Sequence, residues 1–283
     1  MRTRAVVMWG VVVVIAAFFL DASGSLNRYL ALVFPPSGIS PTYLKGQYDQ
    51  KQPIRILLVP GHEVAVPGAY YNGFWERNLN VEVAEKLFSL LASDPHYRVF
   101  VTQNHAGYLP EFANYFETNR SGIIAFRDSV RGVMRSLVNS GTIAKKTDGV
   151  RHNTAHPELA TRLYGINKWA RDNAMDIVLH IHFNDHPGHS SSRPGEYVGF
   201  AIYIPEHQLP NFEASHDIAR SVFRELARYF PVSDHPQESA GIVEDQDLIA
   251  IGASASLEAA GILIEYSYLY EPQVIQTALR PLT

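Results

Sequence analysis

Cysteine is absent from this chain of 283 residues. Its absence excludes disulfide bonds, thiol nucleophiles and cysteine-bound zinc, so any metal ion has to be held by histidine and carboxylate side chains. An excess of basic charge is also missing, because 24 Lys and Arg residues stand against 28 Asp and Glu residues. The sequence therefore predicts no nucleic-acid partner.

Two catalytic patterns are missing as well. The sequence contains neither the Gly-x-Ser-x-Gly turn of serine hydrolases nor a glycine-rich phosphate loop. Apolar residues are abundant, at 46% of the chain, which is usual for a domain with a substantial core. Roughly 230 residues from Pro53 onward suit one large domain better than two small ones.

The N-terminus has the pattern of an export segment. Arg2 and Arg4 precede an apolar run, Ala5–Leu20, which ends at Asp21. Basic residues before such a run are typical of a signal peptide or of an uncleaved membrane anchor, and both alternatives remain open for residues 1–24. Either one predicts that the body of the protein lies outside the cytoplasm, in the periplasm or the cell wall.

The rest of the chain predicts a linker over 25–52, rich in Pro and Gly, and one α/β domain over 53–283. Strand-like and helix-like patterns alternate, which favours a mostly parallel, twisted sheet with helices on both faces. Residues 103–155 fit this alternation poorly and are interpreted as an insertion beside the site. The expected strands are 54–59, 97–102, 176–182, 199–204 and 261–266, and the expected helices are 76–93, 121–139, 157–173 and 211–229.

Three side chains suited to zinc follow or flank the expected strands. His62 comes directly after a buried strand and its Pro-Gly break, Glu76 begins a helix, and His182 ends another strand. Because the carboxyl ends of parallel strands meet at one edge of a sheet, these groups are expected to converge there. Two imidazoles and a carboxylate suit one Zn²⁺ ion in a tetrahedral site with the fourth position open. Taken singly, each residue also has an ordinary structural explanation.

Glu265 is the candidate for the catalytic carboxylate. It lies in the apolar strand Ile262–Tyr266, where a carboxylate without a function would be costly. Such surroundings raise a carboxyl pKa and favour proton transfer between water and a leaving amine.

Taken together, these residues resemble the zinc-dependent N-acetylmuramoyl-L-alanine amidases of the Pro-Gly-His type. Three blocks carry the resemblance, in the order in which that family has them. They are Val59-Pro60-Gly61-His62 with Gly68-Ala69 and Glu76–Asn80, then Leu159, Arg162 and Ile166-Asn167 with Ile181–Asn184, and finally Ile264–Leu269.

The resemblance implies hydrolysis of the amide between N-acetylmuramic acid and L-alanine, with peptidoglycan as the partner and substrate. It also implies that an insertion such as 103–155 is able to carry a regulatory helix, with a regulatory protein as a further partner. Family-specific decoration is the alternative for that insertion.

The chain departs from the family pattern without losing a candidate ligand. Val59 stands where Asp is usual, Glu63 and Ser267 where Gly is usual, His180 where Ser is usual, and Tyr268 where Phe is usual. His180 and His182 share a strand face by alternation, so His180 is interpreted as a buried structural histidine, with a contact at the site as the alternative.

Two other functions remain open from the sequence. One is a zinc peptidase or amidohydrolase acting on another acyl-amide substrate. The other is a catalytically silent, wall-binding regulatory protein, against which the retained Glu265 argues.

Overall fold

The structure is a computed structural model that describes residues 38–147, 149–150, 155–186 and 189–274. The expected export segment, 1–24, lies outside the described residues. Within the described part of the chain, no helix has the length and apolarity needed to cross a membrane.

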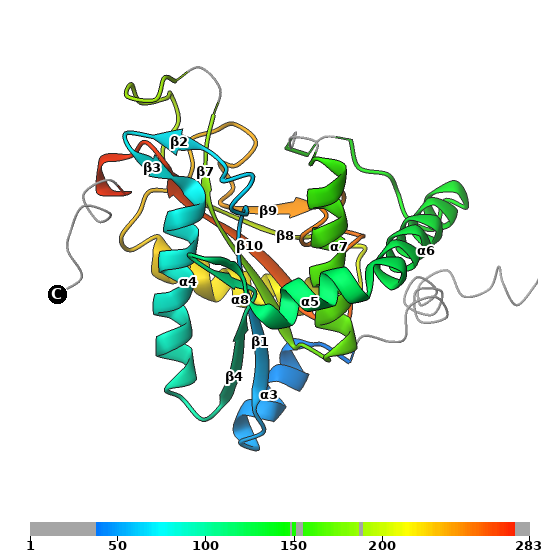
Figure 1. The fold of residues 1–283 in the computed structure, drawn as a ribbon. Helices are drawn as coiled ribbons and strands as arrows, with labels where there is room; N and C mark the ends of the chain where they lie inside the picture. Colours follow the sequence, from blue (N-terminus) through cyan, green and yellow to red (C-terminus); the bar gives the residue numbers. More distant parts are fainter. Residues whose placement is uncertain (1–37, 148, 151–154, 187–188, 275–283) are drawn as a thin grey trace, which may run out of the picture. The chain divides into compact units, whose positions relative to one another are not determined.

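A six-stranded sheet forms the centre of the described chain, in the order β4-β1-β7-β10-β8-β9 (Figure 1). The strands are β1 (Ile54–Pro60), β4 (Tyr97–Val101), β7 (Ile177–Asn184), β8 (Ala201–Pro205), β9 (Ile242–Asp245) and β10 (Ala260–Tyr268). All neighbouring pairs are parallel except β10 with β8. The mostly parallel sheet expected from the alternating pattern is therefore confirmed.

Helices cover both faces of the sheet. On one face lie α5 (Pro110–Thr118) and α7 (Pro157–Asp172), where Phe112 and Trp169 pack against Leu57 and Val59. The opposite face carries α3 (Pro41–Asp49), α4 (Glu76–Ala92) and α8 (Phe212–Leu226). Strand alternation explains this division, because successive side chains of a strand point to opposite faces.

The expected linker 25–52 contains regular structure, contrary to the sequence-based expectation. Ser40 caps α3 by accepting a hydrogen bond from the Tyr43 amide, and a proline follows at the first helical position. Leu44 of α3 packs into the same buried cluster as Ile54 and Leu58. Residues 41–49 therefore form a short helix that belongs to the folded body.

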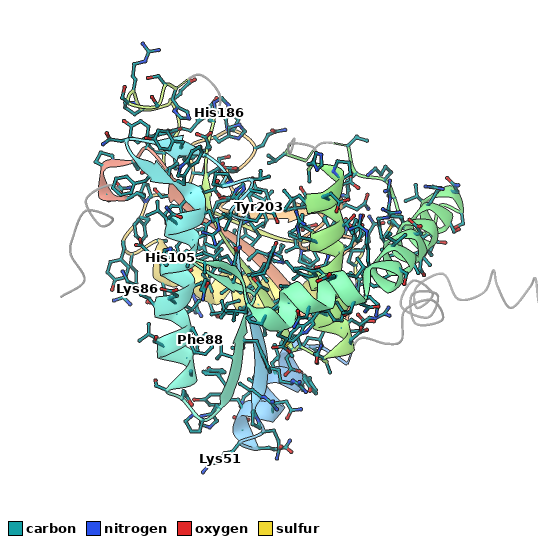
Figure 2. The ribbon with its side chains drawn as sticks, in the orientation of Figure 1. Lys51, Lys86, Phe88, His105, His186 and Tyr203 are labelled. Atoms are coloured by element: carbon teal, nitrogen blue, oxygen red, sulfur yellow. The ribbon has the colours of Figure 1, made fainter. Side chains whose placement is uncertain are left out.

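The expected insertion, residues 103–155, contains short strands and two helices in its described part. It begins with the hairpin β5 (Gln103–Asn104) and β6 (Gly107–Tyr108) and continues through α5 and α6 (Arg120–Asn139). His105, labelled in Figure 2, lies in the turn of this hairpin. Since α6 packs on α7 through Ile123, Phe126 and Val130, the insertion extends the α7 side of the sheet.

Candidate functional site

The His62 turn lies immediately after β1, at the carboxyl edge of the sheet. His62 has a φ of 66°, in the left-handed region that residues with a side chain seldom adopt. The buried Gln103 amide donates hydrogen bonds to the Pro60 carbonyl at 2.7 Å and to the His62 carbonyl at 2.6 Å. Asn80 Nδ2 donates to the Gly61 carbonyl at 3.2 Å, so side chains from two other elements hold this turn.

Glu76, the first residue of α4, places its carboxylate between two imidazoles. Oε2 lies 2.8 Å from His62 Nε2, and Oε1 lies 3.1 Å from His182 Nδ1. The Ala69 amide donates to Oε2 at 3.2 Å. The side chain is 5% exposed, so the carboxylate is oriented from several sides.

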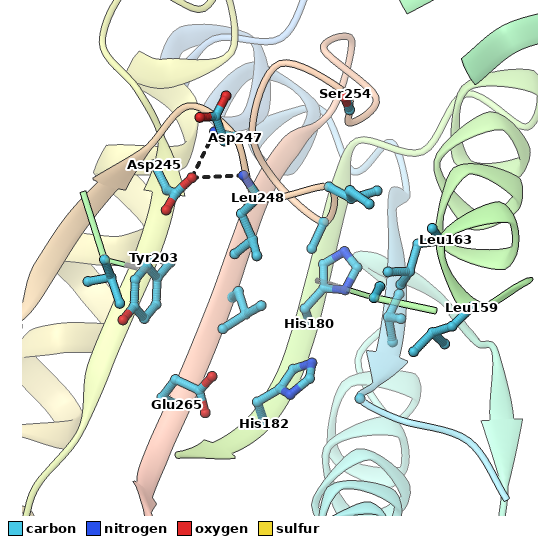
Figure 3. Close-up of a pocket in the computed structure, with 18 of the residues that line it drawn as sticks. Leu159, Leu163, His180, His182, Tyr203, Asp245, Asp247, Leu248, Ser254 and Glu265 are labelled. Carbon is cyan, nitrogen blue, oxygen red and sulfur yellow. Dashed lines mark hydrogen bonds between the residues drawn. The ribbon is translucent and has the colours of Figure 1, made fainter. Parts of the chain in front are cut away.

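His182 and His180 lie on β7 and face the same pocket (Figure 3). His182 joins His62 and Glu76 in a group whose potential ligand atoms all lie within 4.8 Å of one another, and His180 is outside that group. His180 is buried and hydrogen-bonds to the Ala250 backbone. Burial, together with the nearby His182, lowers the pKa of His180 to about 3, so this imidazole is neutral.

Two glycines make room for the imidazoles of His62 and His182. A Cβ at Gly61 would lie 2.2 Å from His182 Cε1, and a Cβ at Gly68 would lie 2.5 Å from Glu76 Oε2 and 2.6 Å from His62 Cδ2. No side chain fits at either position without displacing the group. The two glycines of the loop therefore shape the site directly.

The charges of the group stabilise one another. Burial by itself lowers the pKa of His62, but the charge and hydrogen bond of Glu76 outweigh that effect and the pKa is raised. Burial likewise raises the pKa of Glu76, and the two histidines more than compensate, so its pKa falls well below the usual range. Glu76 is thus an ionised carboxylate, available to a cation.

Glu265 stands beside His182 on the neighbouring strand β10, in direct register with it (Figure 3). Its Oε2 atom is buried and has no hydrogen-bond partner among the described residues. Burial, with the charges of Glu76 and Glu238 adding to it, raises the pKa of Glu265 well above its ordinary value. A carboxylate of this kind has a lone pair and the basicity to accept a proton.

Glu238 is a second buried carboxylate near Glu265, but its oxygens are fully engaged. They accept hydrogen bonds from Tyr203 Oη and Ser233 Oγ, both at 2.6 Å, and from Asn184 Nδ2 at 2.8 Å. Tyr268 Oη donates as well, at 3.1 Å. Glu238 therefore orients its neighbours, and Glu265 is the carboxylate available for proton transfer.

The group of His62, Glu76 and His182 fits a zinc ion by its donor set. It offers two nitrogen atoms and one carboxylate oxygen from buried or half-buried side chains, as zinc sites in hydrolases do. A second group among the described residues, Glu206, His207 and Glu244, is less suited. There, Gln208 Nε2 already donates to Glu206 Oε2 at 3.0 Å, and the Lys146 ammonium lies 3.7 Å from Glu206 Oε1. Both oxygens of Glu206 therefore already face a donor or a cation.

Of the residues that the sequence predicts for the site, His62, Glu76 and His182 come together, and Glu265 lies in register beside His182. Gln103 and Glu238 are not among the predicted site residues. Gln103 comes shortly after the end of strand β4, just as His62 comes shortly after the end of β1. This position at the carboxyl edge of the sheet is the signal that could have indicated it. Glu238 had no such signal, because it lies in a loop and only the folded chain brings its four donors together.

The fold and the site together define an α/β domain with three side chains that could hold a metal ion and a carboxylate in register beside one of them. The chain belongs to the N-acetylmuramoyl-L-alanine amidase family, since the model of that family matches residues 56–279. A curated relative, "Probable N-acetylmuramoyl-L-alanine amidase AmiB" of Haemophilus influenzae, is 35% identical over 74 residues. That match spans 24% of this chain and 17% of the relative.

Solved structures with a similar chain course belong to N-acetylmuramoyl-L-alanine amidases as well. The Clostridium difficile 630 amidase has a TM-score of 0.47 at 16% identity, over 81% of this chain and 87% of that one. The catalytic domain of CwlV from Bacillus (Paenibacillus) polymyxa var. colistinus has a TM-score of 0.46 at 14% identity, over 80% and 87% of the two chains.

Proposed function

We propose that this protein hydrolyses the amide bond between N-acetylmuramic acid and L-alanine in peptidoglycan, with one zinc ion held by His62, Glu76 and His182. The proposal is supported by membership of the amidase family. The observation that carries it is the convergence of these three side chains within 4.8 Å, beside the free oxygen of Glu265.

The roles of the residues follow from their positions. A zinc ion, when bound, polarises the scissile carbonyl and activates water. Glu265 accepts a proton from the attacking water as the carbon–oxygen bond forms. It returns that proton to the amide nitrogen as the carbon–nitrogen bond breaks, so the amine leaves neutral, and the lactyl carboxylic acid then releases the second proton of the water to solvent. Glu76 and the two glycines keep the imidazoles in place throughout.

A cavity large enough for part of a polymeric substrate adjoins His62, Glu76 and His182. A cavity of about 1860 Å³ runs from His62 and Glu265 past α7, with Leu159 and Leu163 on one wall and Leu248 on another. It continues to α6, where Arg131 and Arg135 line it. A cavity of this volume suits a peptide attached to a sugar, and not a small amide alone.

The location and partners of the protein belong to the same proposal. Peptidoglycan lies outside the cytoplasm, which agrees with the export pattern of residues 1–24. Attachment to the membrane through an uncleaved segment, and control by a regulatory protein through α6, remain proposals that rest on the sequence alone.

Purified full-length protein tests the proposal on intact sacculi. We expect zinc near one equivalent per chain and release of stem peptides with a free L-alanine amine. The Glu265→Gln variant should keep its zinc and lose at least a thousandfold in rate. A wild type as inactive as Glu265→Gln, while both bind sacculi, would point instead to a silent wall-binding protein. Cleavage of free peptides in preference to sacculi would favour a zinc peptidase.

A further inference from the structure

Glu63, the residue after His62, forms an ion pair with a distant helix. Its Oε1 accepts a hydrogen bond from Arg162 Nη2 of α7 at 2.7 Å. The carboxylate side chain is 8% exposed and the guanidinium side chain 33% exposed. The pair therefore joins the His62 turn to the helix that covers one face of the sheet.

The turn that carries His62 needs such support. A non-glycine residue in the left-handed region, as His62 is, is strained and persists only where its surroundings hold it. After His62, Glu63 and Val66 exchange backbone hydrogen bonds at 3.2 and 3.0 Å, which closes a small loop. Gln103 holds the carbonyls before and within the turn. Asn80 holds the Gly61 carbonyl from α4, and the Glu63 side chain attaches the turn to α7.

The buried charge of Glu63 makes the pairing with Arg162 necessary. A buried carboxylate is costly unless it is paired, and Arg162 is its only partner in the ion pairs of the described chain. Burial lowers the pKa of Arg162, but the hydrogen bond and charge of Glu63 outweigh it and raise that pKa. Arg162 is anchored in turn, because Ile166 and Trp169 of the same helix lie in the buried core.

We propose that Glu63 and Arg162 are a positioning pair, which holds the His62 imidazole in the orientation that metal binding requires. The inference rests on the proposed function only in taking His62 as a zinc ligand. Neither residue touches the reacting atoms. Their effect is to reduce the freedom of the turn, so that zinc binding does not have to order it. Removing the pair therefore weakens zinc binding before it weakens folding.

Zinc affinity measures this effect without reference to catalysis. Full-length wild type, Glu63→Gln and Arg162→Met would be titrated with zinc in competition with a chromophoric chelator. Groups that orient metal ligands typically contribute about 10-fold to 100-fold in metal affinity, and we expect a loss in that range for both variants. Arg162→Lys keeps the charge and should retain most of the affinity.

The control is Arg120→Met, which removes an exposed ion pair with Glu158 of the same helix α7. It should leave zinc affinity unchanged. The double variant Glu63→Gln with Arg162→Met should be no weaker than the poorer single variant, because both changes remove one interaction. Melting of the metal-free proteins would show that each variant folds.

Three results would overturn the inference: affinities of Glu63→Gln and Arg162→Met within twofold of wild type, additive losses in the double variant, or an equal loss in Arg120→Met. Failure of the proposed function looks different. In that case the wild type itself would bind no zinc, or His62→Ala would bind it as tightly as wild type does.

Discussion

Gly61 and His182 are complementary in shape, since a Cβ at Gly61 would lie 2.2 Å from Cε1 of the His182 ring. Gly61 directly follows strand β1 and His182 lies on β7, and these two strands pair in parallel. A rigid strand end has little freedom to move away from the ring. The smallest substitution at this glycine is therefore a direct probe of the proposed metal site.

The Gly61→Ala variant should bind zinc at least tenfold more weakly, because the added methyl group displaces the His182 imidazole. Equilibrium dialysis with metal analysis would measure the loss. Gly132→Ala in α6 is the control, since a Cβ there has no neighbour within 4 Å. Unchanged zinc binding in Gly61→Ala would contradict the assignment of His182 as a ligand.

Replacing Gln103 with Leu should destabilise the fold. The change removes the donor of two short hydrogen bonds to the Pro60 and His62 carbonyls, and a buried acceptor without a donor costs about 1–3 kcal/mol. We expect a loss of about 2–4 kcal/mol in unfolding free energy, seen as a lower denaturant midpoint.

Gln237→Leu is the matched control for that measurement, because Gln237 also donates to a backbone carbonyl, that of Gly149, but in an exposed position. Its unfolding free energy should change by less than about 0.5 kcal/mol. Equal midpoints for the two variants would show that Gln103 does not support the His62 turn.

Leu44→Ala should lower stability if α3 is part of the folded body. Leu44 is 9% exposed and packs into a core cluster, and Leu-to-Ala changes at buried sites cost about 2–5 kcal/mol. We expect the lower end of that range, since α3 lies at the periphery. Leu90→Ala, at a position 70% exposed, should leave the midpoint in place. Equal denaturant midpoints for Leu44→Ala and Leu90→Ala would show that residues 41–49 act as a linker and not as part of the folded body.

Reversing the charge of Arg131 and Arg135 tests the substrate cavity. Both line it, and within the described chain neither guanidinium forms a side-chain hydrogen bond or an ion pair. The double Glu variant should raise KM for anionic muropeptides about threefold to tenfold at low salt with little change in kcat, since exposed charge contacts contribute about 0.2–1 kcal/mol each. The effect should shrink in high salt because of screening.

The pair Arg220 and Arg224 is the control, having the same spacing on α8, on the other face of the sheet. Reversing their charges should leave KM unaltered. A KM that rises equally for both pairs would mean that net charge alone matters and that α6 does not contact the substrate.

Much of the fold was predictable from local patterns. Runs such as Ile54–Val59 and Asp176–His182 predicted strands, and helices α4, α6, α7 and α8 begin and end within a few residues of their expected bounds. The antiparallel placement of β8 against β10 had no local signal. Helix α3 was missed because its stability depends on the burial of Leu44 against residues of β1, and not on its own periodicity.

The sequence by itself determined which residues could bind a metal and at which edge of the sheet they would lie. The absence of cysteine limited the ligands to histidine and carboxylate, and strand alternation put His180 and His182 on one face. Only the tertiary structure separates those two imidazoles, because it buries His180 away from the group and places His182 against the Glu76 carboxylate and His62. It also leaves Oε2 of Glu265 without a hydrogen-bond partner among the described residues, gives Glu238 hydrogen bonds from four side chains, and pairs Arg162 with Glu63. These are contacts between residues far apart in the chain, and their energies exist only after the sheet has formed.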